Sequence, residues 1–428
     1  MAAAKEKRVA FRVFSGNRLT IPLLLNIWER HGLDARLGIQ AVMAEPGRLT
    51  AAQAAALLSS DACVYSFMTP HLPLIAGEIK GLRGRGHGGP LLVAGGPHVA
   101  GEQELARACG FDLLFGGAGE EEFLQFGRDL LEGKFKPGSG PVAFPAPECG
   151  TGRKGASGNW EMYIPVSRLF KTVPPLEISR GCSWKCRYCQ TGRTKPLHRG
   201  EESIAFYLDE LRRRGLPRVG FISPSALEFG ASRPGRPCLE RIAGLLERCR
   251  LSGFRLIEYG IFPSEIRPDT VSPEALRLLR RHVANRRLTF GAQSAADSRL
   301  KAIGRGHRAA DVENAVRAAN DAGFAANLDF IIALPGETAD ERAELLEFMA
   351  RLGRRFRVYF QLHHFFPLAG SAFARRKPSF LSQKERTAFM ALRRSGSASD
   401  WWLEGERSAH AYLAWLERDF PGFFAQFG

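Results

Sequence analysis

The chain has 428 residues, a formal net charge of +16 and 45% hydrophobic residues. This length exceeds what one hydrophobic core normally serves, so we expect two domains with room for a third small element. No stretch approaches the roughly 20 uninterrupted apolar residues that a membrane-spanning helix needs, and the start of the chain is unlike a signal peptide. These features predict a cytoplasmic protein.

The basic excess would suit an anionic partner such as nucleic acid, an anionic lipid surface or a phosphorylated substrate. Arginine greatly outnumbers lysine, and the arginines are spread over predicted helix faces, as at 211–214 and 279–281. No long basic tail or stripe of interleaved aromatic residues accompanies them. A solvated surface therefore explains the charge better, and nucleic acid is an alternative partner that we do not favour.

Residues 1–133 are predicted to form a doubly wound, Rossmann-like domain. Short apolar runs alternate with amphipathic helical stretches, which is the pattern of a parallel sheet wrapped by helices. Such sheets bind ligands beyond the carboxyl ends of their strands. The predicted strands are Val9–Val13, Ala35–Val42, Ala62–Ser66, Leu91–Ala94 and Asp112–Phe115.

Glycine-rich loops follow several of these strands. Glycine lets the backbone approach a large ligand closely, and these loops open helices whose N-termini favour anionic groups. Ordinary strand-to-helix turns also use glycine, so both interpretations stay open from the residues alone. The candidate binding residues are Gly95, Gly96, Gly117, Gly119 and Glu120.

The rest of the chain divides into three segments. Residues 134–173 are rich in Pro, Gly and Ser and are predicted to be a linker. Strand-helix alternation over 174–378 predicts an open (βα)6 partial TIM barrel, with its chemistry at the carboxyl ends of the strands. Residues 379–428 are predicted to be a helical extension that forms a cap or an interface, with a plain core role favoured. The predicted barrel strands are Leu176–Ser179, Val219–Ser223, Arg255–Tyr259, Leu288–Gln293, Asn327–Ile332 and Val358–His363.

Three cysteines, Cys182, Cys186 and Cys189, follow the first predicted barrel strand. Soft thiolates this close together suit an iron-sulfur cluster or zinc. Zinc would need a fourth ligand, and His198 and Cys149 do not complete a recognisable ligand pair. We assign no chemistry to the cysteines that stand singly in or beside apolar segments, which are Cys63, Cys109, Cys238 and Cys249.

The cysteine loop resembles the radical S-adenosylmethionine (SAM) superfamily, whose signature is C-x-x-x-C-x-x-C with an aromatic residue before the last cysteine, here Tyr188. The resemblance implies that Cys182, Cys186 and Cys189 hold a [4Fe-4S] cluster with one open iron. That iron would bind SAM, and an electron from the cluster would split SAM to a 5'-deoxyadenosyl radical. The resemblance also implies an electron donor such as flavodoxin or ferredoxin. An oxygen-labile cluster agrees with a reducing compartment.

Two further segments resemble loops that hold SAM in this superfamily. Ser223 lies where members often carry a G-G-E-like motif for the amine of SAM, although the motif is degenerate here and Glu228 supplies its nearest acid. Residues 291–297 resemble the strand-four signature, which implies that Gln293, with Ser294 beside it, bonds the ribose. Arg305 would then pair with the carboxylate of SAM. An ordinary helix-start loop with a surface arginine is the alternative.

Two pairs of residues are left open by the sequence. Glu265 and Arg267 could face substrate or SAM, or pair with each other. His363 and His364 end the sixth strand and should point to opposite sides. One of them could face the cavity and move a proton, but a structural role for both is favoured.

The glycine loops of residues 1–133 resemble the cobalamin-binding domain that precedes many radical SAM domains. The resemblance implies cobalamin as a cofactor at these loops. The D-x-H-x-x-G motif that supplies a histidine to the lower face of cobalamin is absent. His71 and His98 are more consistent with polar or backbone-bonding roles than with cobalt ligation, so the lower axial ligand is not indicated.

Together the resemblance covers most of residues 8–375 and implies a cobalamin-dependent radical SAM enzyme. It favours a methyltransferase that acts on an unactivated carbon of a small-molecule substrate, whose identity no motif marks. The alternatives are a radical oxidation or rearrangement in which the corrinoid transfers electrons, and a non-catalytic cobalamin-binding sensor. A tRNA methylthiotransferase is less attractive, because residues 1–133 have no cysteine triad for an auxiliary cluster and no small RNA-binding barrel is evident near the C-terminus.

Overall fold

The computed structural model describes residues 7–84, 89–117, 119–135, 142–144, 160–192 and 194–423. The chain divides into two compact units. Unit 1 is Met1–Pro174 with Leu368–Ala374, and unit 2 is Pro175–Pro367 with Arg375–Gly428. No helix among the described residues is long and apolar enough to cross a membrane.

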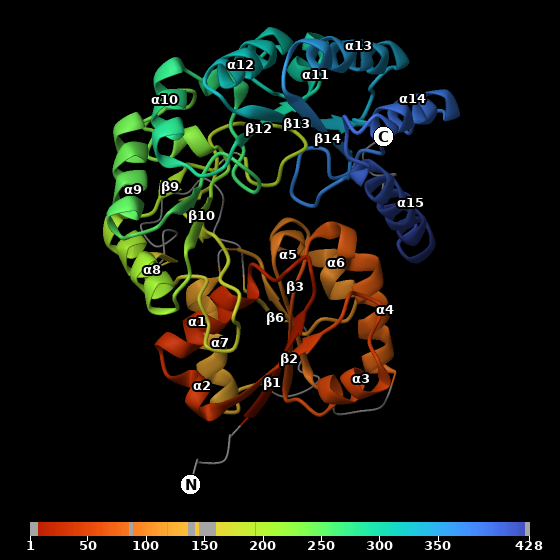
Figure 1. The fold of residues 1–428 in the computed structure, drawn as a ribbon. Helices are drawn as coiled ribbons and strands as arrows, with labels where there is room; N and C mark the ends of the chain where they lie inside the picture. The colour runs from red at the N-terminus through yellow and green to blue at the C-terminus, as the bar shows by residue number, and fades with distance from the viewer. Residues whose placement is uncertain are drawn as a thin grey trace. The chain divides into compact units, whose positions relative to one another are not determined.

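Unit 1 is a six-stranded parallel sheet with helices on both faces (Figure 1). The strand order is β2-β1-β3-β4-β5-β6, which begins with the flavodoxin-like order 2-1-3-4-5. Its strands are β1 (Lys7–Val13), β2 (Leu37–Met43), β3 (Ala62–Ser66), β4 (Leu91–Gly95), β5 (Leu113–Phe115) and β6 (Val142–Phe144). Its α-helices are α1 (Ile21–Arg30), α2 (Leu33–Arg36), α3 (Ala51–Leu58), α4 (Leu72–Arg83), α5 (Pro97–Gly101), α6 (Gln103–Ala108) and α7 (Glu120–Leu131). The predicted doubly wound architecture is confirmed.

The core of unit 1 is aromatic where α1 and α7 meet the sheet. Trp28 stacks on Phe123 with ring centroids 4.7 Å apart, and Phe11 of β1 meets the edge of Trp28. Helix α7 can come this close because Gly127 has no side chain, since a Cβ there would lie 2.7 Å from Trp28 Nε1. This packing fixes the helix that follows the last of the predicted glycine loops.

Most strand boundaries in unit 1 lie within two residues of the prediction, but the start of β2 and the extent of the linker differ for clear reasons. Strand β2 begins at Leu37 because Gly32, with φ of 70°, starts the single helical turn α2 over residues 33–36. Part of the predicted linker 134–173 belongs to unit 1, because β6 joins the sheet edge and Trp160 is 4% exposed. The Asn26 amide also bonds the backbone of Ile164 and Val166, which ties this segment to α1.

Unit 2 contains the predicted open barrel of six parallel strands. They form two three-stranded sheets, β11-β10-β7 and β12-β13-β14. Thr289 N donates to Gly260 O at 2.8 Å, and Ile266 bridges to Phe290, so the segment after β11 continues the barrel to β12. The strands are β7 (Leu176–Glu177), β10 (Arg218–Ile222), β11 (Leu256–Glu258), β12 (Arg287–Gln293), β13 (Ala325–Ile332) and β14 (Val358–His364), with a separate antiparallel pair β8 (Ser179–Arg180) and β9 (Leu197–His198).

Helices alternate with these strands, and further helices follow β14 (Figure 1). The C-terminal extension is part of the unit 2 core, since Trp402 is fully buried and Phe360 of β14 exchanges backbone hydrogen bonds with Ser397 and Ser399. The helices are α8 (Glu201–Arg213), α9 (Leu239–Leu251), α10 (Pro273–His282), α11 (Asp297–Ala302), α12 (Ala309–Asp321), α13 (Ala339–Arg355), α14 (Gln383–Arg394) and α15 (Trp401–Asp419).

Candidate active site

The cysteine loop begins directly after β8 and closes on itself. Gly181 has φ of 81°, and a Cβ there would lie 2.6 Å from Thr194 Oγ1, so the turn requires glycine. Gly192 forms a bridge with Cys182, and a Cβ on Gly192 would lie 2.5 Å from Trp184 O. The two glycines therefore bring the ends of the loop together around the cysteines.

Trp184 of the cysteine loop is held by contacts with two other loops. Its indole Nε1 donates to both carboxylate oxygens of Glu228, at 3.1 and 2.9 Å, and Gly235 N donates to the same carboxylate at 2.6 Å. The Arg267 guanidinium lies 3.5 Å from the centre of the Trp184 ring, and Asp269 holds that guanidinium by two hydrogen bonds. Such a cation-π contact stabilises the ring position by about 1 kcal/mol.

A third attachment joins the cysteine loop to the end of α11. Arg187 N donates to Ile303 O at 2.9 Å. Gly304 has φ of 70°, and its Cβ would lie 2.9 Å from Lys185 O, while a Cβ on Gly306 would lie 2.7 Å from the Trp184 ring. Three other loops, which follow β10, β11 and α11, thus fix the position of the cysteine loop.

The three cysteines line one cavity of about 440 Å³ at the carboxyl ends of the strands. Cys186 is buried, Cys182 and Cys189 are partly buried, and all three thiols are free of disulfides. Burial is the main cause that raises the pKa of the Cys182 thiol. Tyr188 and Arg305 line the same cavity, as do Ser223 and Glu265.

Three free thiols around one cavity are a donor set that suits an iron-sulfur cluster. Among the described residues, no group of three or more His, Cys, Asp or Glu side chains is arranged to hold a metal ion. Each iron of a [4Fe-4S] cluster takes its own ligand, so cluster ligands surround a volume and do not converge on a single ion. The residues present therefore fit a cluster held by Cys182, Cys186 and Cys189.

Arg305 and Gln293 meet over Gly291 of β12. Arg305 Nη2 donates to Gly291 O at 2.7 Å, its Nη1 lies 3.6 Å from Cys186 Sγ, and its Nε has no partner among the described residues. Gln293 has φ of 70°, which is unusual for a residue with a side chain, and the strand register shifts between Gly291 and Gln293. A Cβ on Gly291 would lie 2.7 Å from Gln293 Nε2 and 2.8 Å from Arg305 Nη2.

The other predicted SAM-binding residues have local bonds. Ser223 is buried and donates to Ser225 O at 3.0 Å, but it still lines the cysteine cavity. Ser294 is 2% exposed and accepts from Ala296 N at 3.3 Å, and it does not line that cavity. Glu228, the acid nearest to the degenerate motif, is engaged by Trp184 and Gly235.

This part of the chain matches a known protein family. The family model for the radical SAM superfamily matches residues 176–349, which include the cysteine loop, Gln293 and Arg305. Residues 176–349 belong to the radical SAM superfamily. A [4Fe-4S] cluster and SAM are the cofactors that this membership implies.

Curated proteins similar to this chain include two kinds of methylthiotransferase. A tRNA-2-methylthio-N(6)-dimethylallyladenosine synthase from Shewanella sp. (strain W3-18-1) is 27% identical over 206 residues, covering 44% of this chain and 40% of the relative. The ribosomal protein uS12 methylthiotransferase RimO from Heliobacterium modesticaldum is 27% identical over 182 residues, covering 41% and 38%. The chain thus spans about two-fifths of the length of these relatives.

Solved structures similar to the chain extend over more of it. The radical SAM methyltransferase TsrM from Kitasatospora setae, with tryptophan and a SAM analogue bound, gives a TM-score of 0.58 at 14% identity and covers 86% of this chain and 76% of its own. The cobalamin-dependent radical SAM enzyme OxsB, with aqua-cobalamin and SAM bound, gives 0.57 at 14% identity and covers 97% and 67%. At these identities the likeness shows a shared fold.

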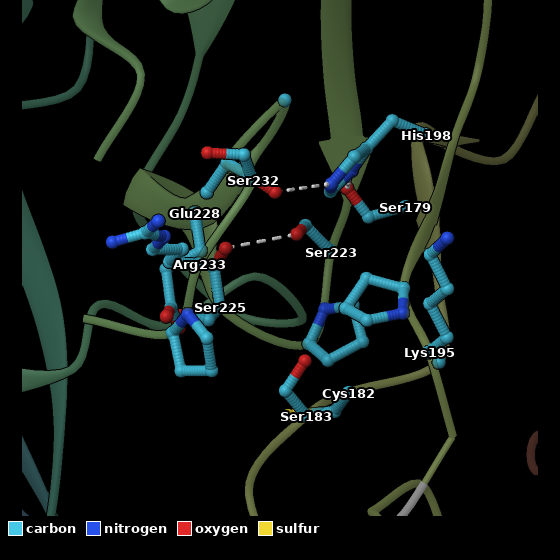
Figure 2. Close-up of a pocket in the computed structure, with 16 residues that line it drawn as sticks. Ser179, Cys182, Ser183, Lys195, His198, Ser223, Ser225, Glu228, Ser232 and Arg233 are labelled. Atoms are coloured by element: carbon cyan, nitrogen blue, oxygen red, sulfur yellow. Dashed lines mark hydrogen bonds between the residues drawn. The ribbon is translucent and has the colours of Figure 1, made fainter. Parts of the chain in front are cut away.

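A second cavity of about 350 Å³ lies beside the cysteine cavity of the radical SAM segment (Figure 2). The two cavities share Ser179, Gly181, Cys182, Ser223 and Pro224. The other lining residues are Ser183 of the cysteine loop, His198 of β9, and residues of the segment before β9 and the loop after β10. No sequence motif marked Lys195 or Arg233, which line it, because isolated basic residues in loops carry no pattern.

The two pairs left open by the sequence lie in unit 2. Arg267 pairs with Asp269 and not with Glu265, while Glu265 lines the cysteine cavity. Burial first, and then the charge of Asp329, raise the pKa of Glu265. His363 is partly exposed, with its Nε2 3.9 Å from Asp329 Oδ1, whereas His364 is buried and its Nδ1 faces Phe365 O at 2.8 Å.

Among the predicted glycines of unit 1, Gly96 has a clear packing role. Gly96 has φ of 93°, and a Cβ there would lie 2.7 Å from Phe67 N, so the turn after β4 needs glycine to pack against the end of β3. Gly95 and Gly119 leave more room, since a Cβ on either would lie 3.4 Å or more from Phe115. Gly117 is exposed, and Glu120 is buried at the start of α7.

His98 and His71 are packed residues of unit 1. His98 is fully buried, its ring stacks near Phe67, and its Nδ1 lies 3.3 Å from Thr69 Oγ1. Burial lowers the pKa of His98 to about 4. The His71 ring lies against Phe14 and fills the space above Gly16, where a Cβ would be 2.5 Å away. These contacts favour the structural roles expected for both histidines.

Proposed function

We propose that this protein is a cobalamin-dependent radical SAM methyltransferase that acts on an unactivated carbon of a small molecule. The observation that carries the proposal is the arrangement of three free thiols and Arg305 around one cavity in the radical SAM segment. The cobalamin part is supported by the flavodoxin-like order of unit 1 and by the fold shared with TsrM and OxsB.

The bound cluster would supply the electron that cleaves SAM to a 5'-deoxyadenosyl radical. Cys182, Cys186 and Cys189 would ligate three of its irons, and the tightly attached loop would keep them in place. Arg305 would bind the carboxylate of SAM through its guanidinium, and Gln293 would bond the ribose with its amide. Tyr188 would lie beside SAM as part of the cavity wall.

Cobalamin would lie at the carboxyl ends of the strands of unit 1, at the loops that contain Gly95, Gly96, Gly117, Gly119 and Glu120. Ligands of such sheets bind at this edge. Gly95 and Gly119 are partly buried and carry no side chain that would keep a large planar ligand from the backbone. Methyl transfer itself would be the chemistry that the corrinoid provides.

Methylthio transfer, the activity in the names of the curated relatives, is the rival reaction. It is less favoured because residues 1–133 contain only two cysteines, Cys63 and Cys109, and so have no cysteine triad for a second cluster. Cys63, for example, is fully buried, its thiol donates to Leu57 O, and burial raises its pKa to about 12. Such a thiol is a poor metal ligand.

The test starts with anaerobic reconstitution of the whole chain with iron, sulfide and hydroxocobalamin, followed by gel filtration. We expect about four irons per chain, one corrinoid by its visible spectrum, and 5'-deoxyadenosine from SAM when a reductant is added. Cys186→Ala should lose the iron and the SAM cleavage but keep the corrinoid. The matched control Cys238→Ala, outside the cysteine cavity, should resemble wild type.

Gly95→Phe tests the corrinoid site separately. A Cβ at Gly95 has room, since its nearest neighbour would be 3.6 Å away, but a phenyl ring would cover the edge of the sheet. We expect loss of bound corrinoid with iron content and SAM cleavage retained. Full corrinoid binding by Gly95→Phe would show that the corrinoid does not bind at the proposed loops. SAM cleavage by Cys186→Ala would show that the cluster is not held by the three cysteines.

A further inference from the structure

The second cavity adjoins the reaction centre but has its own walls. It touches the cysteine cavity through Cys182 and Ser223 and extends from there between the segment before β9 and the loop after β10 (Figure 2). Its volume of about 350 Å³ is of the size that holds part or all of a small molecule. Anything bound there would lie next to the chemistry proposed above.

The histidine in this cavity adds no charge. His198 Nε2 faces Ala231 O at 3.4 Å, and a carbonyl can only accept, so Nε2 carries the proton. Burial is the main cause that lowers the pKa of His198, which keeps the ring neutral at neutral pH. Its Nδ1 then accepts from Ser179 Oγ at 2.9 Å, so the Ser179 proton is already engaged.

The carboxylate in this cavity is also engaged. Glu228 is the single Asp or Glu among the described lining residues. It accepts two hydrogen bonds from the Trp184 indole and one from Gly235 N. These donors use its oxygens, so Glu228 offers little to a cation in the cavity.

The other polar groups that line the second cavity are hydrogen-bond donors and positively charged side chains. Lys195 and Arg233 stand on opposite sides of the cavity in Figure 2, and neither side chain has a hydrogen-bond or ion-pair partner among the described residues. Ser183 and Ser232 add hydroxyl groups to the lining. Ser225 also lines the cavity and is only 5% exposed. Its Oγ is buried and lacks a hydrogen-bond partner among the described residues.

We propose that the second cavity binds an anionic group of the substrate, a carboxylate or a phosphate, through Lys195 and Arg233. Paired cationic donors with hydroxyl groups between them match the several acceptor oxygens of such a group. The inference rests on the proposed function, because it takes the neighbouring cavity as the place where SAM is cleaved. It adds the substrate class, a small organic acid or phosphate ester.

SAM also carries a carboxylate, so the anionic group bound in the second cavity could belong to the substrate or to SAM. Arg305, the residue expected to meet the SAM carboxylate, lines the cysteine cavity and not the second one. The second cavity has no Phe, Tyr or Trp among its described lining residues to stack an adenine. Both features favour substrate over SAM as the occupant.

Calorimetric titration of the full chain with inorganic phosphate, and separately with succinate, tests the proposal. The titrations are run on the protein as purified and on the reconstituted protein saturated with SAM. We expect at least one probe to bind in both states, and Lys195→Gln and Arg233→Gln each to weaken it about tenfold. The controls Lys301→Gln and Arg236→Gln, also exposed and outside the cavity, should bind like wild type.

The possible results separate cleanly. Failure of both probes to bind, or equal effects of the controls, would overturn the proposal. Competition between SAM and the probe, with weaker SAM binding by Lys195→Gln, would also overturn it and assign the cavity to the SAM carboxylate. Because these titrations need neither corrinoid nor turnover, they can succeed even if methyl transfer is disproved, and methyl transfer can hold even if they fail.

Discussion

Trp184 attaches the cysteine loop to the barrel by two contacts that one substitution can separate. Trp184→Phe keeps an aromatic ring beneath Arg267 but removes the N–H that Glu228 accepts. We expect the free energy of unfolding to fall by about 1–2 kcal/mol, and the reconstituted protein to keep less iron through gel filtration. Denaturant titration and an iron assay measure the two effects.

The control for this variant is Trp401→Phe, because Trp401 is 52% exposed. It should change neither quantity. Iron retention equal to wild type in Trp184→Phe would show that the hydrogen bond to Glu228 does not position the loop.

Gly291 makes room for the two side chains proposed to bind SAM. A methyl group on this residue would displace Gln293 Nε2 and Arg305 Nη2, because both would lie within 2.8 Å of it. We expect Gly291→Ala to weaken SAM binding about tenfold in calorimetry. Gly244→Ala, where a Cβ meets nothing within 4 Å, should leave SAM affinity unchanged. Unaltered affinity in Gly291→Ala would remove both residues from the SAM site.

His98 should make the protein sensitive to mild acid. Its folded pKa of about 4 lies below the usual value near 6.5, so the unfolded chain binds more protons between these values. Stability that is present above pH 6.5 is therefore lost as the pH falls toward 4. Between pH 7 and 4.5 wild type should lose about 2 kcal/mol more than His98→Gln in urea titrations. Parallel losses would mean that other groups cause the acid sensitivity.

At the residue scale, local sequence marked residues that the structure brings to one cavity. The three cysteines and Tyr188 belong to one motif and Arg305 to another segment, and all of them line that cavity. The attachment of Trp184 was missed, because Glu228 and Arg267 lie on loops that are distant from it in the chain. The pairing of Arg267 with Asp269 was missed because Glu265 and Asp269 both lie two residues from Arg267 in the sequence. Lys195 and Arg233 were missed because isolated basic residues in loops carry no pattern.

At the scale of elements, α5 of unit 1 is packed against the returning segment 368–374. A Cβ on Gly101 would lie 2.4 Å from Ala369 C and 2.5 Å from Gly370 N, and Ala369 N donates to Thr69 Oγ1 at 3.1 Å. We expect Gly101→Ala to lower the free energy of unfolding by about 1–3 kcal/mol because the backbone must shift. Thermal unfolding measures the loss.

Gly77→Ala is the matched control, since this glycine of α4 has open space around its Cβ position. It should be neutral or stabilising by up to about 1 kcal/mol. Equal stability of the two variants would show that the returning segment yields easily to an added methyl group.

Strongly patterned elements were the ones that sequence located well. Strand β3 has the predicted bounds, because five buried residues follow an exposed turn. Strand β6 was not expected, since its three residues lie among Pro and Gly and gain their partners only from β5. The turn α2 was also missed, because four residues are too few to show a helical period.

At the scale of the whole molecule, the charge of +16 should influence electron delivery. A negatively charged carrier such as a flavodoxin would be steered toward a basic protein, and salt screens this attraction. We expect the rate of SAM cleavage with such a carrier to fall about tenfold between 50 and 500 mM salt. With dithionite as the control reductant the dependence should be weaker. A rate that does not respond to salt would exclude electrostatic steering.

Unit 1 is discontinuous, since residues 368–374 complete it only after most of unit 2 has been traversed. A domain at the start of a chain ordinarily folds while the ribosome is still translating the next one. Here the last piece of the first unit emerges some two hundred codons after the rest of it. During that interval unit 1 would lack residues 368–374, which pack against α5. Unit 1 can therefore complete its folding only after most of unit 2 has been synthesised.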